Sequence, residues 1–426
     1  ISLSRQLEER LEKYFGDALM TFHSRETAAS KRKTAENIRE LESGKGNYIV
    51  LGTRSSLFLP HHNLGLIIVD EEHDTSYKQD SPAPRYNGRD TALILSLIHK
   101  SNVILGSATP SLEELYNCST GRHEQGILNE RFHGSDDSEI EIIDTRAERR
   151  KNGMKGSFSR KLIAQIEDTI SKGEQVIILR ARRSWAPVMQ CESCGEIQKC
   201  PHCNVAMSLH KSSAEKEHSG DTGQSRTSGR AVCHWCGYKA DYTGHCNKCG
   251  GTLASFGAGT QKIEEEAATL FPTARIARLD SDTVQNRNFE RKTIKEFSEG
   301  RIDILIGTQI VTKGFDFSKL SLVAVIAADS LLGVQDFRAD EKALQLLQQL
   351  RGRCGRRSER GKFVIQTAQP EHPIYTNLSN SRPEGFRLDL MQERQDFGYP
   401  PYSRIIEIEV KDSFEDRAER MAGKLR

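Results

Sequence analysis

"LGLIIVDEEHDTSYKQ" (64–79) joins a run of branched apolar residues directly to four titratable residues, Asp70 to His73. The run is continuous rather than alternating, which is typical of a parallel strand covered on both faces. Open α/β sheets bind ligands at the carboxyl ends of such strands. The acidic group is therefore either a solvated turn or a pair of catalytic carboxylates, and the surrounding sequence decides between them.

Further continuous apolar runs alternate with helical patterns along the chain, which predicts βαβ units and an α/β fold with two parallel-sheet lobes. We expect a first lobe over 1–118, a polar connector over 119–138, and a second lobe over 139–186 and 253–369. The expected strands lie within 47–52, 64–70, 102–107, 139–144, 174–180, 274–280, 303–308, 321–329 and 361–367. The expected second-lobe helices lie within 158–172, 259–271 and 287–299.

A cysteine-rich block over 187–252 interrupts the second lobe. Eight of the ten cysteines form four C-x-x-C pairs, and the polar segment 211–230 between them is expected to be a disordered loop. Two such pairs complete a tetrahedral S₄ site, so the block predicts two structural zinc ions, with an iron–sulfur cluster as the lesser alternative. Spacing alone leaves open which pairs share a metal. A dithiol oxidoreductase would use a single pair, and four clustered pairs argue against it.

Bulk composition narrows the function only slightly. Lys and Arg total 61 against 59 acidic residues, so nucleic-acid binding would need local basic surface rather than overall charge. No apolar run approaches the roughly 18 residues of a membrane span, and no signal peptide is visible. The chain starts at Ile1 and enters helical patterning at once, which we interpret as an internal piece of a longer protein.

Other polar stretches also follow apolar runs. "GSATPS" (106–111) ends the run after the acidic one, and "GTQIVTKGFDF" (307–317) ends a run in the second lobe. In "QLLQQLRGRCGRR" (345–357), Arg353 and Arg356 are three residues apart, one helical turn, so both guanidinium groups are expected to face one ligand. Alone, such arginines indicate a solvated or DNA-facing helix; at a cleft between lobes they fit arginine fingers on a γ-phosphate.

In this order, the D-E-x-H, S-A-T and Q-x-x-G-R-x-G-R patterns resemble superfamily-two helicases. The finer resemblance is to the primosomal replication-restart helicases, and it covers essentially the whole chain. It is carried by "GTRSSLFLP", "DEEHDTSYKQ", "APRYNGRD", "GSATPSLE", "APVMQCESCG", "KCPHCN", "GTQKIEEE", "GTQIVTKGFDF" and "FGYPPYSR".

The resemblance implies RecA-like lobes and an ATP-dependent 3′→5′ DNA helicase that recognises stalled or collapsed forks and D-loops. It implies primosome assembly and reloading of the replicative helicase in the bacterial cytoplasm, at the nucleoid and with no membrane partner. The implied partners are DNA forks, single-stranded DNA, ATP with Mg²⁺, primosome proteins, the replicative helicase with its loader, and single-stranded DNA-binding protein. Residues 370–426 would begin the family's C-terminal domain.

The resemblance also implies residue roles. Asp70 would position Mg²⁺, Glu71 would be the catalytic base, and His73, Ser107 and Thr109 would couple the nucleotide site to DNA contacts. On the second lobe, the implied nucleotide-site residues are Gly314, Asp316, Gln349, Arg353 and Arg356. The implied DNA contacts are Thr53, Arg54, Thr308, Gln309 and Lys313, with Tyr77, Arg85 and Tyr86 on an aromatic loop over 77–89. For these tyrosines, ordinary surface packing is the competing interpretation.

For the cysteines, the resemblance implies that the outer pairs share one zinc and the inner pairs the other. The outer set is Cys191, Cys194, Cys246 and Cys249, and the inner set is Cys200, Cys203, Cys233 and Cys236. Cys118 and Cys354 are expected to be packing residues.

The sequence departs from the family in three ways, the first of which is "ARRSWAP" (181–187) where the family usually has N-R-R-G-Y-A-P. Arg351 and Cys354 stand where the arginine motif usually has small residues, and the phosphate-cradling G-x-x-x-x-G-K-[ST] loop does not occur. We therefore expect a fragment with a truncated first lobe, which binds single-stranded DNA in a salt-sensitive way but does not hydrolyse ATP at a helicase-like rate. A non-motor zinc scaffold for DNA or primosome proteins is the alternative function.

Overall fold

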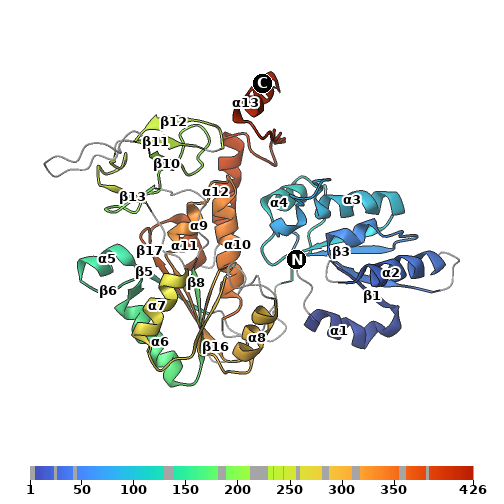
Figure 1. Cartoon of the computed structure of the whole chain (residues 1–426), viewed down its shortest axis with the longest axis horizontal. Coiled ribbons are helices and arrows are strands. Elements are labelled where there is room, and N and C mark those ends of the chain that lie inside the picture. The colour runs from blue at the N-terminus through green and yellow to red at the C-terminus, as the bar shows by residue number, and fades with distance from the viewer. Residues whose placement is uncertain are drawn as a thin grey trace.

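The computed structural model describes residues 5–23, 26–41, 46–128, 138–180, 189–211, 229–233, 235–242, 244–255, 260–280, 287–308, 317–354, 361–379 and 383–425. The described elements form two α/β lobes, with a cysteine-rich module beside the second lobe (Figure 1). The predicted α/β class is confirmed.

The second lobe is built on a six-stranded, fully parallel sheet in the order β14-β15-β8-β16-β17-β5. Each expected second-lobe run overlaps one of its strands. The strands are β5 (Glu139–Asp144), β8 (Gln175–Arg180), β14 (Ile276–Leu279), β15 (Ile304–Gly307), β16 (Leu320–Ile326) and β17 (Lys362–Thr367).

Helices cover both faces of this sheet, which explains the continuous apolar runs. Along β8, Val176 and Ile178 pack on one face with α6 (Arg160–Ser171) and α7 (Thr260–Leu270). Ile177 and Leu179 pack on the other face with helices that follow later in the chain. These helices are α8 (Arg287–Ser298), α10 (Ala339–Arg351), α11 (Pro373–Ser379) and α12 (Pro383–Asp396). Each fully buried branched side chain contributes about 1.5–3 kcal/mol, so this lobe has a core on both sheet faces.

The first lobe contains two parallel strand pairs. β1 (Leu19–Phe22) pairs with β2 (Ile49–Gly52), and β3 (Leu66–Asp70) pairs with β4 (Asn102–Gly106). Its helices are α1 (Arg5–Phe15), α2 (Ala28–Glu40), α3 (Gly88–His99) and α4 (Leu112–Ser119), with 3₁₀ helices η1 (Gly16–Ala18), η3 (Arg54–Phe58) and η4 (Thr75–Tyr77). Ile68 and Ile104 are 64% and 52% exposed, so one face of the β3–β4 pair is not covered by the described residues.

The Cys module, residues 189–255 where described, is made of short antiparallel strands. β9 (Met189–Cys191) pairs with β13 (Leu253–Ser255), and β10 (Ser208–Lys211), β11 (Gly229–Val232) and β12 (Lys239–Asp241) form a three-stranded sheet. Most of the expected 211–230 loop lies outside the described residues. The remaining elements are α5 (Thr145–Arg150), β6 (Met154–Lys155), β7 (Phe158–Ser159), α9 (Asp329–Leu332) and α13 (Glu415–Leu425).

Two local features differ from the sequence-based expectation. β1 was not predicted, because "LMTF" is too short to show a period beside the longer helical pattern before it. α10 ends at Arg351, so Arg353 lies in the turn after the helix, and its expected place in a helical turn is wrong. Among the described helices, none is both long and apolar enough to span a bilayer.

Candidate nucleotide site and candidate metal centres

The acidic turn begins where β3 ends at Asp70. Glu71 has φ +52°, a left-handed conformation that costs a non-glycine residue about 1–2 kcal/mol. The N–H of Glu72 then donates to the carbonyl of Gly106 at 3.1 Å, which ties the turn to the end of β4. Strained backbone of this kind is concentrated at functional sites, because the surrounding structure must hold it in place.

The two adjacent glutamates have opposite environments. The Glu71 side chain is 43% exposed, whereas that of Glu72 is 1% exposed. Glu72 accepts hydrogen bonds from Ser111 N at 2.7 Å, Ser111 Oγ at 3.0 Å and Arg89 at 3.1 Å. Burial raises the pKa of Glu72, and Ser111 and Arg89 partly offset the rise. Glu72 therefore holds the turn against α3 and α4, whereas the Glu71 side chain is partly exposed and its Oε2 lies 3.7 Å from His73 Nδ1.

His73 connects the turn to both lobes. Its Nδ1 lies 2.7 Å from Ser107 Oγ, and its Nε2 lies 3.3 Å from Thr109 Oγ1 in the same lobe. The Nε2 atom also lies 2.8 Å from Gln349 Nε2, on α10 of the second lobe. The amide N–H of Gln349 donates to Nε2, so a neutral His73 carries its proton on Nδ1 and donates it to Ser107. The structure thus brings together His73, Ser107, Thr109 and Gln349.

The aromatic loop is attached to the same strand end. The Tyr77 hydroxyl donates to the Asp70 carbonyl at 2.6 Å, and burial raises the pKa of Tyr77. Arg54 donates to the carbonyls of Ser76 and Lys78 at 2.7 and 2.6 Å. Gly88 makes room for both, because a Cβ there would lie 3.2 Å from the Tyr77 ring and 3.3 Å from Arg54 Cβ.

The other residues of the first lobe that are expected to contact DNA make their contacts away from the acidic turn. Tyr86 packs edge-on against Phe58, with ring centroids 4.9 Å apart, and Phe58 is itself exposed. Arg85 is exposed and pairs with Glu409 at 2.8 Å. Thr53 directly precedes η3, and its N–H donates to the carbonyl of Phe22. Their expected roles on DNA stay predictions.

Most of the expected second-lobe site falls outside the described residues. This applies to Gln309, Lys313, Gly314, Asp316 and Arg356. Thr308 is described, and it lies buried just after β15. The roles of Thr308, Gln349 and Arg353 stay predictions.

Each C-x-x-C pair forms the same knuckle. The residue after the second cysteine has positive φ, and its N–H donates to the carbonyl of the first cysteine at 2.9 Å. These residues are Gly195 (+77°), Asn204 (+53°), Gly237 (+76°) and Gly250 (+73°). Glycine and asparagine tolerate this conformation best, so the local sequence sets the shape of all four knuckles.

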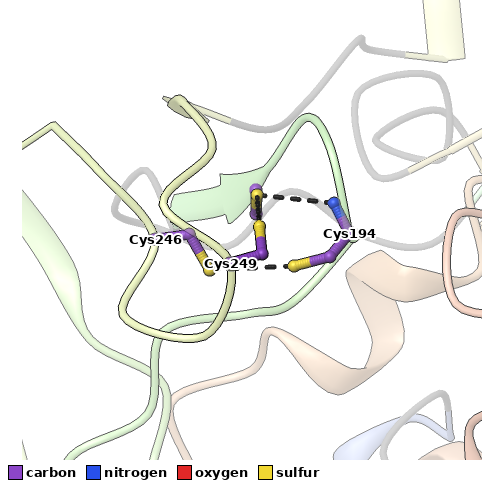
Figure 2. Close-up of side chains that lie close together, drawn as sticks. Cys194, Cys246 and Cys249 are labelled. Carbon is purple, nitrogen blue, oxygen red and sulfur yellow. Dashed lines mark hydrogen bonds between the residues drawn. The ribbon is translucent and has the colours of Figure 1, made fainter.

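The knuckles bring the eight thiols into two groups. Cys191, Cys194, Cys246 and Cys249 form the outer group, and Cys200, Cys203, Cys233 and Cys236 form the inner one. The expected outer-with-outer and inner-with-inner grouping is confirmed, and the close-up shows sulfurs of the outer group turned toward one another (Figure 2).

The sulfur spacing fits a tetrahedral metal. The Sγ atoms of Cys191 and Cys249 are 3.5 Å apart, and those of Cys194 and Cys246 are 3.7 Å apart. Four thiolates at about 2.3 Å from zinc would be about 3.8 Å apart. Burial raises the pKa of Cys194 to about 12, whereas at Cys191 the effect of burial is outweighed by N–H donors from Cys194 and Ser193 and by the thiols of Cys249 and Cys194, which lower the pKa to about 7. Such donors stabilise thiolates, the form that binds metal.

Sequence reasoning missed several polar residues that organise the site. The sequence did not distinguish the role of Glu72 from that of Glu71, because two adjacent glutamates give no sign of which one is buried. The roles of Arg89 and Ser111 were also missed, although Ser111 is identifiable as the N-cap of α4 from its position before a helical pattern. Glu341 and Arg394 were missed as well, and no local pattern marks either of them.

Comparison with known proteins agrees with this geometry. The family model described as "DEAD/DEAH box helicase" matches residues 1–118, and the one described as "Helicase conserved C-terminal domain" matches 244–358. These matches, the carboxylate strand end and the parallel sheets all fit a superfamily-two helicase.

The relatives give the particular family. The chain is 36% identical to the replication restart protein PriA of Bacillus subtilis, over 94% of this chain and 48% of that protein. It is 34% identical to PriA of Haemophilus influenzae, over 100% and 55%, and 36% identical to PriA of Rickettsia prowazekii, over 100% and 62%. The chain is similar to the PriA proteins over nearly its whole length, and it spans about half the length of the relatives it matches.

Among solved structures, that of RecG bound to a three-way DNA junction covers 99% of this chain. The chain covers 41% of the RecG structure, with a TM-score of 0.45 and 14% identity.

Proposed function

We propose that this chain forms the motor of an ATP-dependent DNA helicase that moves 3′→5′ at stalled or collapsed forks and D-loops. The observation that supports this best is His73, which contacts Thr109 in one lobe and Gln349 in the other beside the exposed Glu71. Because His73 is hydrogen-bonded to both lobes at the end of the carboxylate strand, it responds to any change in the distance between the two lobes.

The proposed chemistry divides the work between neighbouring residues. Asp70 would hold the Mg²⁺ that accompanies ATP, and this ion would neutralise phosphate charge. Glu71 takes the proton of the attacking water, since it is exposed and Glu72 is not. From the second lobe, Arg353 and Arg356 stabilise the charge that develops on the phosphate, and Gly314 and Asp316 line the nucleotide.

DNA binding is proposed along the edge shared by the two lobes. Thr53, Arg54 and Thr308, together with Gln309 and Lys313, would contact the strand's phosphates. Tyr77 supports a link to catalysis, because its hydroxyl is bonded to the backbone of Asp70. Movement of the aromatic loop on DNA would therefore reach the carboxylate strand end directly.

We further propose two structural zinc ions, one in each cysteine group, because all four ligand positions of each site are filled by thiols. The biological setting proposed is replication restart in the bacterial cytoplasm at the nucleoid. There the protein would act with primosome proteins, single-stranded DNA-binding protein and the replicative helicase with its loader.

Strand displacement by the full-length protein tests this function. Two forks, one with a single-stranded 3′ arm and one with a single-stranded 5′ arm, should be unwound at different rates. The faster one should be the fork whose single-stranded arm lets the protein move 3′→5′ toward the duplex, and neither should be unwound without ATP. Glu71→Gln should bind fork DNA normally and unwind none, while the exposed control Glu124→Gln unwinds at the wild-type rate. Equal unwinding of both forks would contradict the polarity, and an active Glu71→Gln would contradict the site.

A non-motor scaffold is the second candidate. It is favoured by the hydrogen bond from Tyr399 to the Cys203 carbonyl, because this bond fastens the Cys module to the segment after α12. If scaffolding were the main role, Glu71→Gln would retain full restart activity in cells. Loss of restart in that variant would favour the motor.

A further inference from the structure

Helix α10 presents one polar face toward the first lobe. Glu341, Gln345 and Gln349 are spaced four residues apart, so they share this face. Gln349 bonds His73, and Gln345 donates to Glu341 Oε1 at 3.3 Å. Glu341 Oε1 also accepts from the backbone N–H of Leu112 at 2.9 Å. One helix thus contacts the first lobe at two points about 12 Å apart along its axis.

The Leu112 contact lies directly behind the S-A-T turn. Leu112 is the first residue of α4, and Ser111 before it caps that helix and bonds the buried Glu72. A carboxylate from the second lobe therefore occupies a helix N-terminus of the first lobe, where negative charge is favoured. Any shift of α10 along this contact moves the segment that carries Ser107 and Thr109.

Arg394 of α12 makes this contact possible. Glu341 is buried, and an unpaired buried carboxylate would be strongly unfavourable. The Arg394 guanidinium bonds Glu341 Oε2, and it also donates to Glu113 of α4 at 3.0 Å and to the Pro400 carbonyl at 2.9 Å. Arg394 is itself only 3% exposed. One buried cation therefore joins both lobes and the segment after α12.

An aromatic stack continues from this cation to the inner cysteine group. Arg394 lies 5.1 Å from the centre of the Phe337 ring, and Phe337 stacks on Tyr399 with centroids 4.4 Å apart. The Tyr399 hydroxyl donates to the carbonyl of Cys203, an inner-group cysteine, at 2.7 Å. The contacts from Cys203 to Leu112 are therefore continuous.

We propose that Glu341 and Arg394 are positioning residues that hold the lobes in the arrangement in which these contacts form and make turnover at the nucleotide site depend on the inner cysteine group. The latch, defined as Glu341, Arg394, Glu113 and the Leu112 N–H, acts through α10. Because α10 is rigid, the Glu341–Leu112 and Gln349–His73 contacts form or break together. The inference rests on the proposed ATPase function.

The test uses Glu341→Gln and Arg394→Lys in the full-length protein. In Glu341→Gln the amide oxygen still accepts from Leu112, but the charge pair is lost. In Arg394→Lys the charge is kept, but a single ammonium group cannot reach Glu341, Glu113 and Pro400 together. We expect DNA-stimulated kcat to fall about ten- to a hundredfold while KM for ATP changes less than about twofold, as for misplaced catalytic groups.

Lys172→Gln is the control for both latch variants. It removes an exposed ion pair with Asp168, far from the latch in the sequence, and should leave kcat unchanged.

A second measurement reports lobe arrangement without catalysis. Labels at the exposed Lys33 of α2 and at the exposed Glu299, one on each lobe, should show a narrow distance distribution in the wild-type protein and a broad one in both latch variants. A wild-type distribution in the folded variants would overturn the latch. If the wild-type protein hydrolysed no ATP, the proposed function would fail, whereas the distance measurement would still decide the latch.

Tyr399→Phe removes only the hydroxyl that reaches Cys203, so it tests the link to the cysteine group even if the latch variants misfold. Turnover should fall about three- to tenfold, the loss expected for one hydrogen bond, with metal content unchanged. Unchanged turnover would overturn the link.

Discussion

The Cys module and the inter-lobe junction each join segments that are far apart in the chain, but they do so with different chemistry. The junction consists of the His73–Gln349 contact and the latch, and it uses ordinary hydrogen bonds, the ion pairs of the buried Arg394 with Glu341 and Glu113, and the apolar contact of Leu112 with the second-lobe core. The module uses eight thiols on four identical knuckles. Metal–thiolate bonds fix one geometry, whereas hydrogen bonds between lobes can be exchanged. We therefore expect the module, once it holds metal, to stay in one state and the junction to alternate.

Metal removal should give the largest effect, and only in the module. Structural zinc contributes about 10–16 kcal/mol to small metal domains, so a strong chelator should abolish amide-exchange protection in β9 to β13. The six-stranded sheet should keep its protection, because its core lies on helices rather than on the thiols. Elemental analysis before treatment should give two zinc ions per chain. If the module kept its amide-exchange protection in metal-free protein, the module would not depend on metal as the comparison with the junction assumes.

Substitution at the acidic turn should give the next largest effect, on turnover rather than stability. Glu71→Gln removes the proposed base and should lower ATP hydrolysis by about 10²–10⁴-fold in the full-length protein, with little change in melting temperature. Glu72→Gln should do the reverse, costing about 1–3 kcal/mol of stability because a buried hydrogen-bonded carboxylate is altered. Phosphate release and thermal melting distinguish the two variants, and equal effects on turnover would remove the distinction between them.

Gln349→Ala tests the junction with a smaller expected effect. The variant removes the amide that donates to His73 Nε2, a bond worth about 0.5–1.5 kcal/mol, so turnover should fall about two- to tenfold. Stability of each lobe should not change, because the bond lies between them. Gln392→Ala, which removes an exposed bond to Asp396 within α12, is the matched control and should leave turnover at the wild-type rate.

Gly250→Ala tests the knuckle geometry and should give the smallest effect. Its Cβ would meet open space, so the cost is conformational alone, about 1 kcal/mol for φ +73°. Gly65→Ala is the control, since its Cβ also meets open space and its φ is not positive. Chemical unfolding followed at the module for Gly250→Ala and at the first lobe for Gly65→Ala measures the two costs, and equal costs would show that the knuckle does not require a left-handed residue.

Local sequence determined the strands of the second lobe and the four knuckles. A buried parallel strand needs a continuous apolar run, and a knuckle needs two cysteines followed by a residue that tolerates positive φ; both requirements are met within a few residues. The resemblance added what spacing left open, namely which pairs of cysteines share a site. The carboxylate strand end was likewise visible, because β3 and its acidic turn are contiguous in sequence.

The tertiary structure alone decided which of these polar groups face one another. It separated the exposed Glu71 from the buried Glu72, because a left-handed turn points the second toward Ser111 and Arg89. The sequence of α10 presents Glu341, Gln345 and Gln349 as a polar stripe, the pattern of a solvated face. This stripe instead meets the first lobe, and the charge of Glu341 is balanced by Arg394, 53 residues farther along the chain. Hydrogen bonds between side chains on different elements depend on how those elements pack, and no periodicity within either element encodes that packing.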